Sequence, residues 1–222
     1  MIEIEVKIKV SNIKETRQKL LALGCQIDKD FYRERNALYD FPDGRLEKTR
    51  QALRLRMIGK KSFLTFKGQL QKSRSFKIRD EYESEIKNVR DFKKILKKLG
   101  LRPVFEYRKK RMLLRKDRVK ICLDETEVGN YLELEGQRSD IVRLAKLLGY
   151  SRKDFIKIDY VQMIKEKRQK NYSSSSSSSP SSSSTSNSSS TFSTSSSNSP
   201  SASTSSGSLF SISASGSDSP ET

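Results

Sequence analysis

The stretch Ile2-Glu3-Ile4-Glu5-Val6-Lys7-Ile8-Lys9-Val10 alternates apolar and charged residues without an exception. Successive side chains of a β-strand point to opposite faces, so this pattern predicts a strand with one apolar and one charged face. Most strands of this kind turn their charged face to solvent. Whether this one does depends on the charges that the later strands carry.

The composition divides the chain into two parts. Residues 173–222 contain no Lys or Arg and thirty serines. Such a segment has too few apolar residues to offset the entropy lost on ordering, so we expect a disordered Ser-rich tail. Residues 1–172 then form one domain of ordinary size. They hold all 45 Lys and Arg and 25 of the 27 acidic residues, which gives a net charge of +20.

This positive charge favours polyanionic partners, namely nucleic acid, an anionic membrane surface or a phosphorylated small molecule. Cys25 and Cys122 are the two cysteines, and no signal-like segment precedes the first strand, so we expect a reduced, cytoplasmic protein. No apolar run approaches membrane-spanning length, so no membrane partner is expected. The sequence has no histidine, which removes the commonest general base and most zinc sites.

The rest of the chain predicts amphipathic helices alternating with groups of strands. Three helices are expected at about residues 12–23, 92–99 and 141–148, each closed by a glycine. A basic fourth helix is expected at about residues 153–170. Strands are expected at residues 26–40, 52–57, 63–67, 77–87, 104–115, 118–124 and 131–136. This order of elements indicates an antiparallel α+β protein.

From residue 52 onward the strands repeat the division into an apolar and a charged face. We expect the apolar faces to pack under the helices. Counted together with the first strand, the charged faces carry seven bases: Lys7, Arg54, Arg56, Lys67, Arg79, Lys109 and Arg111. They also carry seven carboxylates: Glu3, Glu5, Glu81, Glu83, Asp124, Glu133 and Glu135.

Two architectures satisfy this pattern. In one, the charged faces form an open, solvated sheet surface with cross-strand ion pairs. In the other, the sheet closes into a barrel with a charged interior, although ordinary barrels fill their interior with apolar side chains. A charged interior therefore implies a highly charged ligand, and a metal–polyphosphate fits best. The bases can bind phosphate oxygens, the arginines bidentately, and the carboxylates can hold Mg²⁺ or Mn²⁺.

Glu3-Ile4-Glu5-Val6-Lys7 resembles the ExExK signature of the CYTH superfamily, also called triphosphate tunnel metalloenzymes. The segments that follow stand in the order of that family: 52–56, 64–68, 79–83, 107–111, 121–124 and 129–135. The resemblance covers about residues 1–165. It is greatest to the class IV adenylate cyclase-like and small bacterial or archaeal members.

The resemblance implies an eight-stranded antiparallel tunnel, with helices outside, that binds a triphosphate and a divalent metal. The phosphates would be held by the seven bases, among which Lys7, Arg56 and Lys67 would act in catalysis together with Glu5. The metal would be held by Glu3, Glu5, Asp124, Glu133 and Glu135, with Glu81 and Glu83 in support. Without histidine, the base would be a metal-bound hydroxide, a carboxylate or a desolvated lysine. For each residue, a plain cross-strand ion pair is the competing interpretation.

Three functions stay open. The first is a metal-dependent phosphohydrolase acting on inorganic tripolyphosphate, a nucleoside triphosphate or thiamine triphosphate. The second is a class IV-type adenylate cyclase that converts ATP to cyclic AMP and pyrophosphate, for which the tunnel residues would be the same. The third is a noncatalytic polyphosphate- or RNA-binding module, although no aromatic-rich RNA motif is present, so we do not expect nucleic acid as the partner. A homodimer stays open as well.

Overall fold

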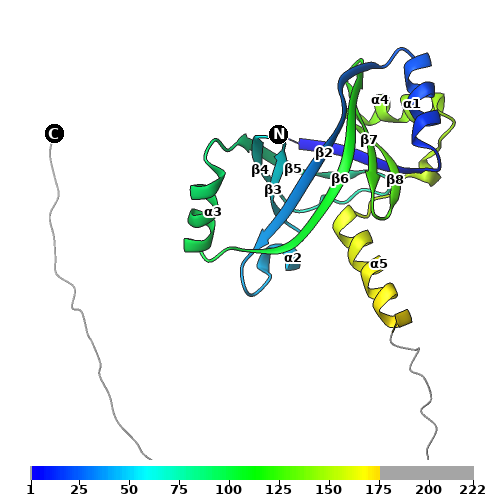
Figure 1. Cartoon of the computed structure of the whole chain (residues 1–222). Helices are drawn as coiled ribbons and strands as arrows, with labels where there is room; N and C mark the ends of the chain where they lie inside the picture. Colours follow the sequence, from blue (N-terminus) through cyan, green and yellow to red (C-terminus); the bar gives the residue numbers. More distant parts are fainter. Residues whose placement is uncertain (1, 176–222) are drawn as a thin grey trace, which may run out of the picture. The chain divides into compact units, whose positions relative to one another are not determined.

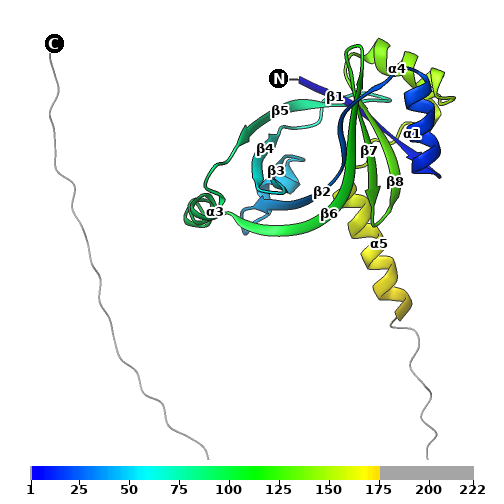
Figure 2. The same ribbon diagram turned by 45° about the horizontal axis from the view of Figure 1, so that its top comes forward.

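The fold is an antiparallel barrel, seen in a computed structural model that describes residues 2–175. Within these residues eight strands close in the order β1-β5-β4-β3-β2-β6-β7-β8 (Figures 1 and 2). The strands are β1 Ile2–Val10, β2 Gln26–Asp40, β3 Ala52–Ile58, β4 Lys61–Lys67, β5 Lys77–Glu85, β6 Arg102–Lys116, β7 Val119–Thr126 and β8 Gly129–Glu135. The predicted tail lies outside the described residues, apart from residues 173–175.

Strand β1 closes the barrel, because it pairs with β5 along one edge and with β8 along the other. Glu5 stands opposite Lys77 of β5 and opposite Glu135 of β8. Residues directly opposite each other in an antiparallel pair project to the same face. The charged faces of neighbouring strands therefore coincide, and closure turns them inward. The eight-stranded barrel with a charged interior is confirmed, and the open solvated sheet is wrong.

Helices cover two regions of the outer surface. Helix α1 (Ile13–Ala22), capped by the side chain of Asn12, and helix α4 (Arg138–Leu147) share an apolar core with the outer faces of β1, β7 and β8. Helix α3 (Val89–Lys98) packs Leu96 with Leu55 and Ala37, so it covers β2 and β3. Figure 1 shows α1 and α4 on one side of the barrel and α3 on the other. These cores hold the strands in register and so fix which residues line the interior.

A short helix that was not predicted, α2 (Arg45–Lys48), follows β2. The carboxylate of Asp40, at the end of β2, accepts hydrogen bonds from the backbone N–H groups of Leu46 and Glu47, both at 3.0 Å. Asp40 thus caps a helix from outside it. The helix was not predicted because its capping residue, Asp40, is separated from its first residue, Arg45, by a turn.

The expected final helix over residues 153–170 is wrong at its start. A 3₁₀ turn, Arg152–Asp154, is followed by extended chain, and helix α5 runs from Tyr160 to Ser175. The extended segment is held to β1, since the N–H of Ile156 donates to the carbonyl oxygen of Lys7 at 2.8 Å. Similarly, β5 ends at Glu85 rather than Lys87. Among the residues that the structure covers, no helix is long and apolar enough to span a membrane.

Candidate functional site

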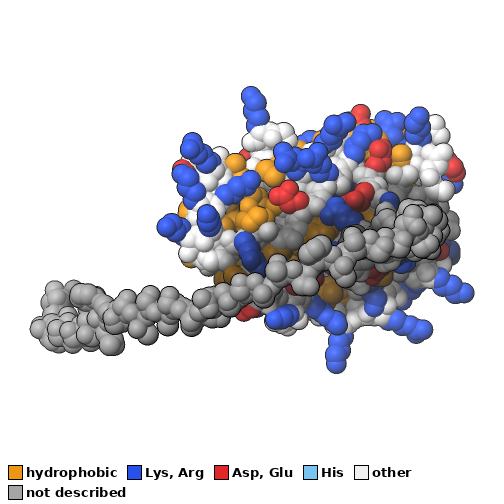
Figure 3. Space-filling model, turned by 60° about the horizontal axis from the view of Figure 1, so that its bottom comes forward, with side chains coloured by type: hydrophobic (Ala, Val, Ile, Leu, Met, Phe, Trp, Pro, Cys, Tyr) orange, Lys and Arg blue, Asp and Glu red, His pale blue; other side chains and the backbone are white. Residues whose placement is uncertain are grey.

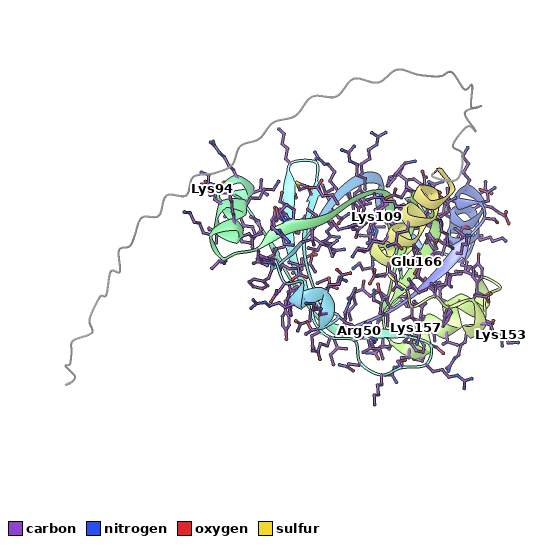
Figure 4. The ribbon with its side chains drawn as sticks, turned by 90° about the horizontal axis from the view of Figure 1, so that it is seen from below. Arg50, Lys94, Lys109, Lys153, Lys157 and Glu166 are labelled. Atoms are coloured by element: carbon purple, nitrogen blue, oxygen red, sulfur yellow. The ribbon has the colours of Figure 1, made fainter. Side chains whose placement is uncertain are left out.

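The barrel interior is a tunnel whose wall is made of charged side chains. Thirteen of the fourteen predicted site residues line it; the exception, Asp124, lies fully buried in the wall. Ion pairs between bases and carboxylates fill most of the space and leave a cavity of about 120 Å³. Figure 4 looks towards the tunnel from the side of α5, with Lys109 and Arg50 on opposite sides of the opening. Lys94 and Lys153 lie at the periphery of this view.

The first group of charges surrounds Glu3. Lys67 Nζ donates to both carboxylate oxygens of Glu3 at 2.9 Å and also pairs with Glu81. Arg79 Nε lies 3.5 Å from Glu3 Oε2. Burial, followed by the neighbouring charge of Glu5, raises the pKa of Glu3 to about 7, although Lys67 opposes the shift. The site is therefore rich in carboxylates, and a further cation near Glu3 would be favourable.

The second group is an ion pair between Glu5 and Lys77, with Nζ 3.2 Å from Oε1. Burial acts to raise the pKa of Glu5, but Lys77 and other lysines outweigh it, and the pKa falls to about 2. Burial lowers the pKa of Lys77 below its ordinary value in spite of Glu5. Lys77 was not predicted as a site residue, although it continues the alternation that contains Arg79 and Glu81.

The third group is centred on Asp124. Arg111 binds it bidentately, with Nε on Oδ1 and Nη2 on Oδ2, both at 2.6 Å, and Lys109 Nζ donates to Oδ2 at 3.0 Å. Arg111 also contacts Glu133, which lies 3.2 Å from Lys7 Nζ. Asp124 is completely buried. Here a predicted metal ligand serves as the counter-ion of two predicted phosphate-binding residues.

The remaining predicted residues lie on the β3–β5 wall and at the tunnel edge. Arg56 Nη2 donates to Glu83 Oε1 at 2.6 Å. Arg54 Nη2 donates at 3.2 Å to the hydroxyl of Thr65, which itself donates to Glu83. Glu135 pairs with Lys120 at 2.7 Å and stands opposite Glu5 in the β1–β8 register. The tunnel thus brings the predicted residues together, while the predicted metal ligands are paired with different bases.

Strand β2 contributes a carboxylate that the sequence interpretation missed. Glu34 is fully buried, with Arg56 Nη1 at 3.6 Å and Lys109 Nζ at 3.7 Å. Neither of its oxygens accepts a hydrogen bond from the part of the chain that is described, and the same holds for the amide of the buried Asn36. Burial favours a raised pKa for Glu34, but Lys109, Arg111 and Arg56 lower it to about 2. Glu34 and Asn36 are two residues apart and therefore face the same side of β2, and this spacing was the signal in the sequence that could have found them.

Helix α5 supplies a residue to the tunnel that no strand pattern could reveal. Tyr160, at its first position, is buried with its ring 4.1 Å from Lys7 Nζ and 5.1 Å from Lys109 Nζ. It packs edge-to-face on Tyr131 of β8. The first turn of helix α5 therefore contributes to the tunnel wall, with Tyr160 and Val161 among its lining residues.

A divalent metal fits the donor chemistry of the tunnel, which offers carboxylate oxygens and no histidine. Across residues 2–175 no three Asp, Glu or Cys side chains are gathered in the arrangement of a metal site. The carboxylates pair with bases instead. Glu3 and Glu5 are the best-suited ligands, because their mutual repulsion contributes to the raised pKa of Glu3. Binding a cation there would relieve that repulsion.

Comparison with known proteins gives one family. The model of the CYTH domain matches residues 1–160. A relative from Methanocaldococcus jannaschii, named "Putative adenylate cyclase", is 29% identical over 174 residues, and the match covers 73% of this chain and 98% of the relative.

Two solved structures share the fold. One, from Vibrio parahaemolyticus, is described as a "putative adenylate cyclase"; its TM-score is 0.67 at 18% identity, over 74% of this chain and 98% of that one. The other, a protein from Pyrococcus horikoshii, has a TM-score of 0.64 at 26% identity, over 75% of this chain and 99% of that one. The barrel of this chain is thus similar to proteins from both bacteria and archaea.

Proposed function

The chain belongs to the CYTH domain family, and from this premise we propose that it is a divalent-metal-dependent phosphohydrolase that cleaves a triphosphate inside its tunnel. One observation carries the proposal: bases from β1, β3, β4, β5 and β6 project into one closed lumen together with carboxylates. A surface that bound polyanions in general would have no need to bury both signs of charge in a tunnel.

The balance of charge supports a requirement for metal. The nine bases of the lumen are Lys7, Arg54, Arg56, Lys67, Lys77, Arg79, Lys109, Arg111 and Lys120. Among the described residues nine carboxylates accompany them: Glu3, Glu5, Glu34, Glu81, Glu83, Asp124, Glu133, Glu135 and Asp159. The lumen is therefore close to neutral, and a bare triphosphate would bring several uncompensated negative charges into it. Divalent cations bound with the triphosphate would restore neutrality.

The bases have a direct role in this proposal. Lys7, Arg54, Arg56, Lys67, Arg79, Lys109 and Arg111 bind phosphate oxygens and stabilise the charge that develops on the transferred phosphoryl group. Because they are now paired with carboxylates, the phosphate chain must replace existing ion pairs. Glu34 is the buried counter-ion of Arg56 and Lys109 in the unliganded protein, at 3.6 and 3.7 Å.

The proposed metal ligands are Glu3 and Glu5, with Glu133, Glu135 and Asp124 available from the facing strands and Glu81 and Glu83 in support. A bound divalent ion would neutralise the triphosphate and polarise a phosphoryl oxygen. Lys77 lies in the lumen beside Glu5, where it adds a further positive charge for the triphosphate.

Adenylate cyclase activity is a second candidate, favoured by the name of the Methanocaldococcus relative. The two reactions give different products from the same tunnel. Purified protein would be offered ATP, tripolyphosphate and thiamine triphosphate with Mg²⁺ or Mn²⁺, and orthophosphate, pyrophosphate and cyclic AMP would be scored separately. Orthophosphate supports the phosphohydrolase, whereas cyclic AMP with equimolar pyrophosphate would replace it by a cyclase.

A matched sample with excess chelator tests the noncatalytic alternative. We expect chelation to abolish product formation with every substrate. Triphosphate binding that persists in chelator, with no product formed under either condition, would show a binding module and overturn the proposal.

A further inference from the structure

The outer surface of the barrel carries the whole excess of positive charge. Residues 1–172 have a net charge of +20, whereas the lumen holds nine bases and nine carboxylates and is close to neutral. A triphosphate bound with metal in the tunnel therefore leaves this excess unexplained. Figure 3 shows more Lys and Arg than Asp and Glu side chains on the face that it presents. A positive surface of this kind attracts polyanions.

One part of this surface concentrates the charge in four exposed bases on the outward side of β2 and β6, which we call the basic block. Arg33 of β2 stands directly opposite Lys110 of β6. The next outward pair along the same two strands is Arg35 opposite Arg108. Like charges directly opposite each other in an antiparallel pair destabilise the sheet. The barrel therefore gains no stability from this arrangement, and an anionic partner would relieve the repulsion.

The basic block has few counter-ions. Across residues 2–175 the side chains of Arg33, Arg35 and Arg108 make no ion pair and no hydrogen bond. Lys110 is the one member with an acidic partner in this part of the chain, since its Nζ lies 3.1 Å from Oε1 of Glu125. A guanidinium group presents a planar fork of donors that matches two oxygens of a phosphate. Three such groups of the block are thus available to a phosphorylated ligand.

The basic block lies in a gap between the two helix-covered regions of the outer surface. Ala37, two residues after Arg35 on β2, belongs to the core under α3. Phe31, two residues before Arg33, packs against the core that α1 and α4 share. Neither region covers the four bases between them, so a large partner can reach the block.

A groove of about 340 Å³ adjoins the basic block. Its lining includes Arg35 and Arg108 of the block together with Arg168 of α5. Nη2 of Arg168 pairs with Glu127 at 2.7 Å, and Glu106 is the other acidic residue of the lining. Three guanidinium groups from three different elements thus line one groove, against two carboxylates.

We propose that the basic block and this groove bind the sugar–phosphate backbone of a nucleic acid, outside the tunnel and independently of the triphosphate. Lys and Arg contacts to phosphates supply most of the affinity for such a backbone, and they need no apolar wall. The core of a protein interface, in contrast, is largely apolar and depleted of charge. None of the large apolar residues that are exposed in the described chain belongs to the block or lines the groove. The lack of an aromatic RNA motif argues against recognition of bases, and binding to the backbone does not require one.

The test measures the binding of a fluorescein-labelled oligothymidylate without a 5′-phosphate, by anisotropy at a series of salt concentrations. We expect Arg35→Gln/Arg108→Gln to weaken binding at low salt by about tenfold or more. The slope of log affinity against log salt should become shallower by about 1.4, the contribution of two phosphate contacts on a single strand. Thermal unfolding is the check on folding, and the variant should be no less stable than the wild type because a like-charged pair is removed.

Two controls separate the basic block from general charge and from the tunnel. Arg138→Gln/Lys146→Gln removes the same charge from exposed positions of α4 and should change the affinity less than about twofold. Arg56→Gln removes a base of the lumen and should likewise leave oligothymidylate binding unchanged. Cleavage of tripolyphosphate by Arg35→Gln/Arg108→Gln should equal that of the wild type, because both residues lie outside the lumen.

The outcomes separate this inference from the proposed function. No binding of oligothymidylate at low salt, or an equal loss in the two double variants, would overturn the nucleic-acid site. A loss with Arg56→Gln that the block variant does not show would place the oligonucleotide in the tunnel and overturn it as well. Tighter binding to polyglutamate or to anionic phospholipid vesicles than to oligothymidylate would assign the surface to a different partner. If oligothymidylate binds through the block but no triphosphate is cleaved, the inference holds and the proposed function fails.

Discussion

The hydroxyl of Tyr160, on α5, donates a 2.9 Å hydrogen bond to Oδ2 of Asp124, on β7, in the interior of the barrel. The same oxygen accepts from Lys109 and Arg111. One buried carboxylate therefore joins the helix at the tunnel end to two bases of the lumen. This gives Asp124 a structural role whether or not it also binds metal.

Changing Asp124→Asn should lower the free energy of unfolding by about 3–5 kcal/mol in metal-free buffer, because Lys109 and Arg111 stay buried with one counter-charge fewer. Denaturant titration in the presence of chelator measures this. The control is Asp28→Asn, which removes a partly exposed partner of Arg115 and should cost less than about 1 kcal/mol. Equal stability of Asp124→Asn and the wild type would contradict the structural role of Asp124.

Changing Glu5→Gln should abolish metal-dependent turnover while the barrel stays folded, because it removes a proposed metal ligand and the partner of Lys77. Glu85→Gln is the matched control, since Glu85 lies at the exposed end of β5 and contacts Lys61 at 4.0 Å. Turnover would be measured with circular dichroism as the check on folding. Full activity of Glu5→Gln would contradict the assignment of Glu5 to the site.

The pKa of Glu3 predicts a pH dependence of stability. Because that pKa is raised from 4.5 to about 7, the folded state retains a proton that the unfolded state releases. Its contribution is fully present below pH 4.5 and is lost as the pH rises to about 7, by an amount on the order of 3 kcal/mol. In chelator, the stability of wild type relative to Glu3→Gln should therefore decline over this range. A constant difference would contradict the raised pKa.

Changing Glu34→Gln should strengthen metal-free binding of tripolyphosphate about tenfold, or about 1.4 kcal/mol. The reason is that the substitution removes a negative charge from beside Arg56 and Lys109. The same change should destabilise the unliganded protein, since Arg56 and Lys109 lose a buried counter-ion. Calorimetry in chelator measures the binding. Glu125→Gln, whose carboxylate pairs with Lys110 on the outer side of the barrel, is the control and should have little effect. Weaker binding by Glu34→Gln would show that Glu34 helps to hold the ligand.

The local sequence was sufficient to predict most strands, and it also predicted the inward-facing charged residues wherever apolar and charged residues alternate strictly. In β1 the alternation is unbroken from Ile2 to Val10, and Glu3, Glu5 and Lys7 lie on the tunnel side as predicted. In β2 the register against β6 is regular from Tyr32 to Leu38, but Arg33 and Arg35, which are exposed, are charged like the buried Glu34 between them. No alternation of apolar and charged residues marks this stretch, and Glu34 and Asn36 were missed for that reason.

The sequence by itself determined that each strand has an apolar and a charged face, because the two-residue repeat of a strand is a local property. Only the tertiary structure decided that the charged faces look inward, because this depends on β1 pairing with both β5 and β8, far away in the chain. It also decided which charges are partners, as in Glu5 with Lys77 and Arg111 with Asp124. The place of Tyr160 likewise follows from docking, since helix α5 meets Asp124 across a sequence separation of 36 residues.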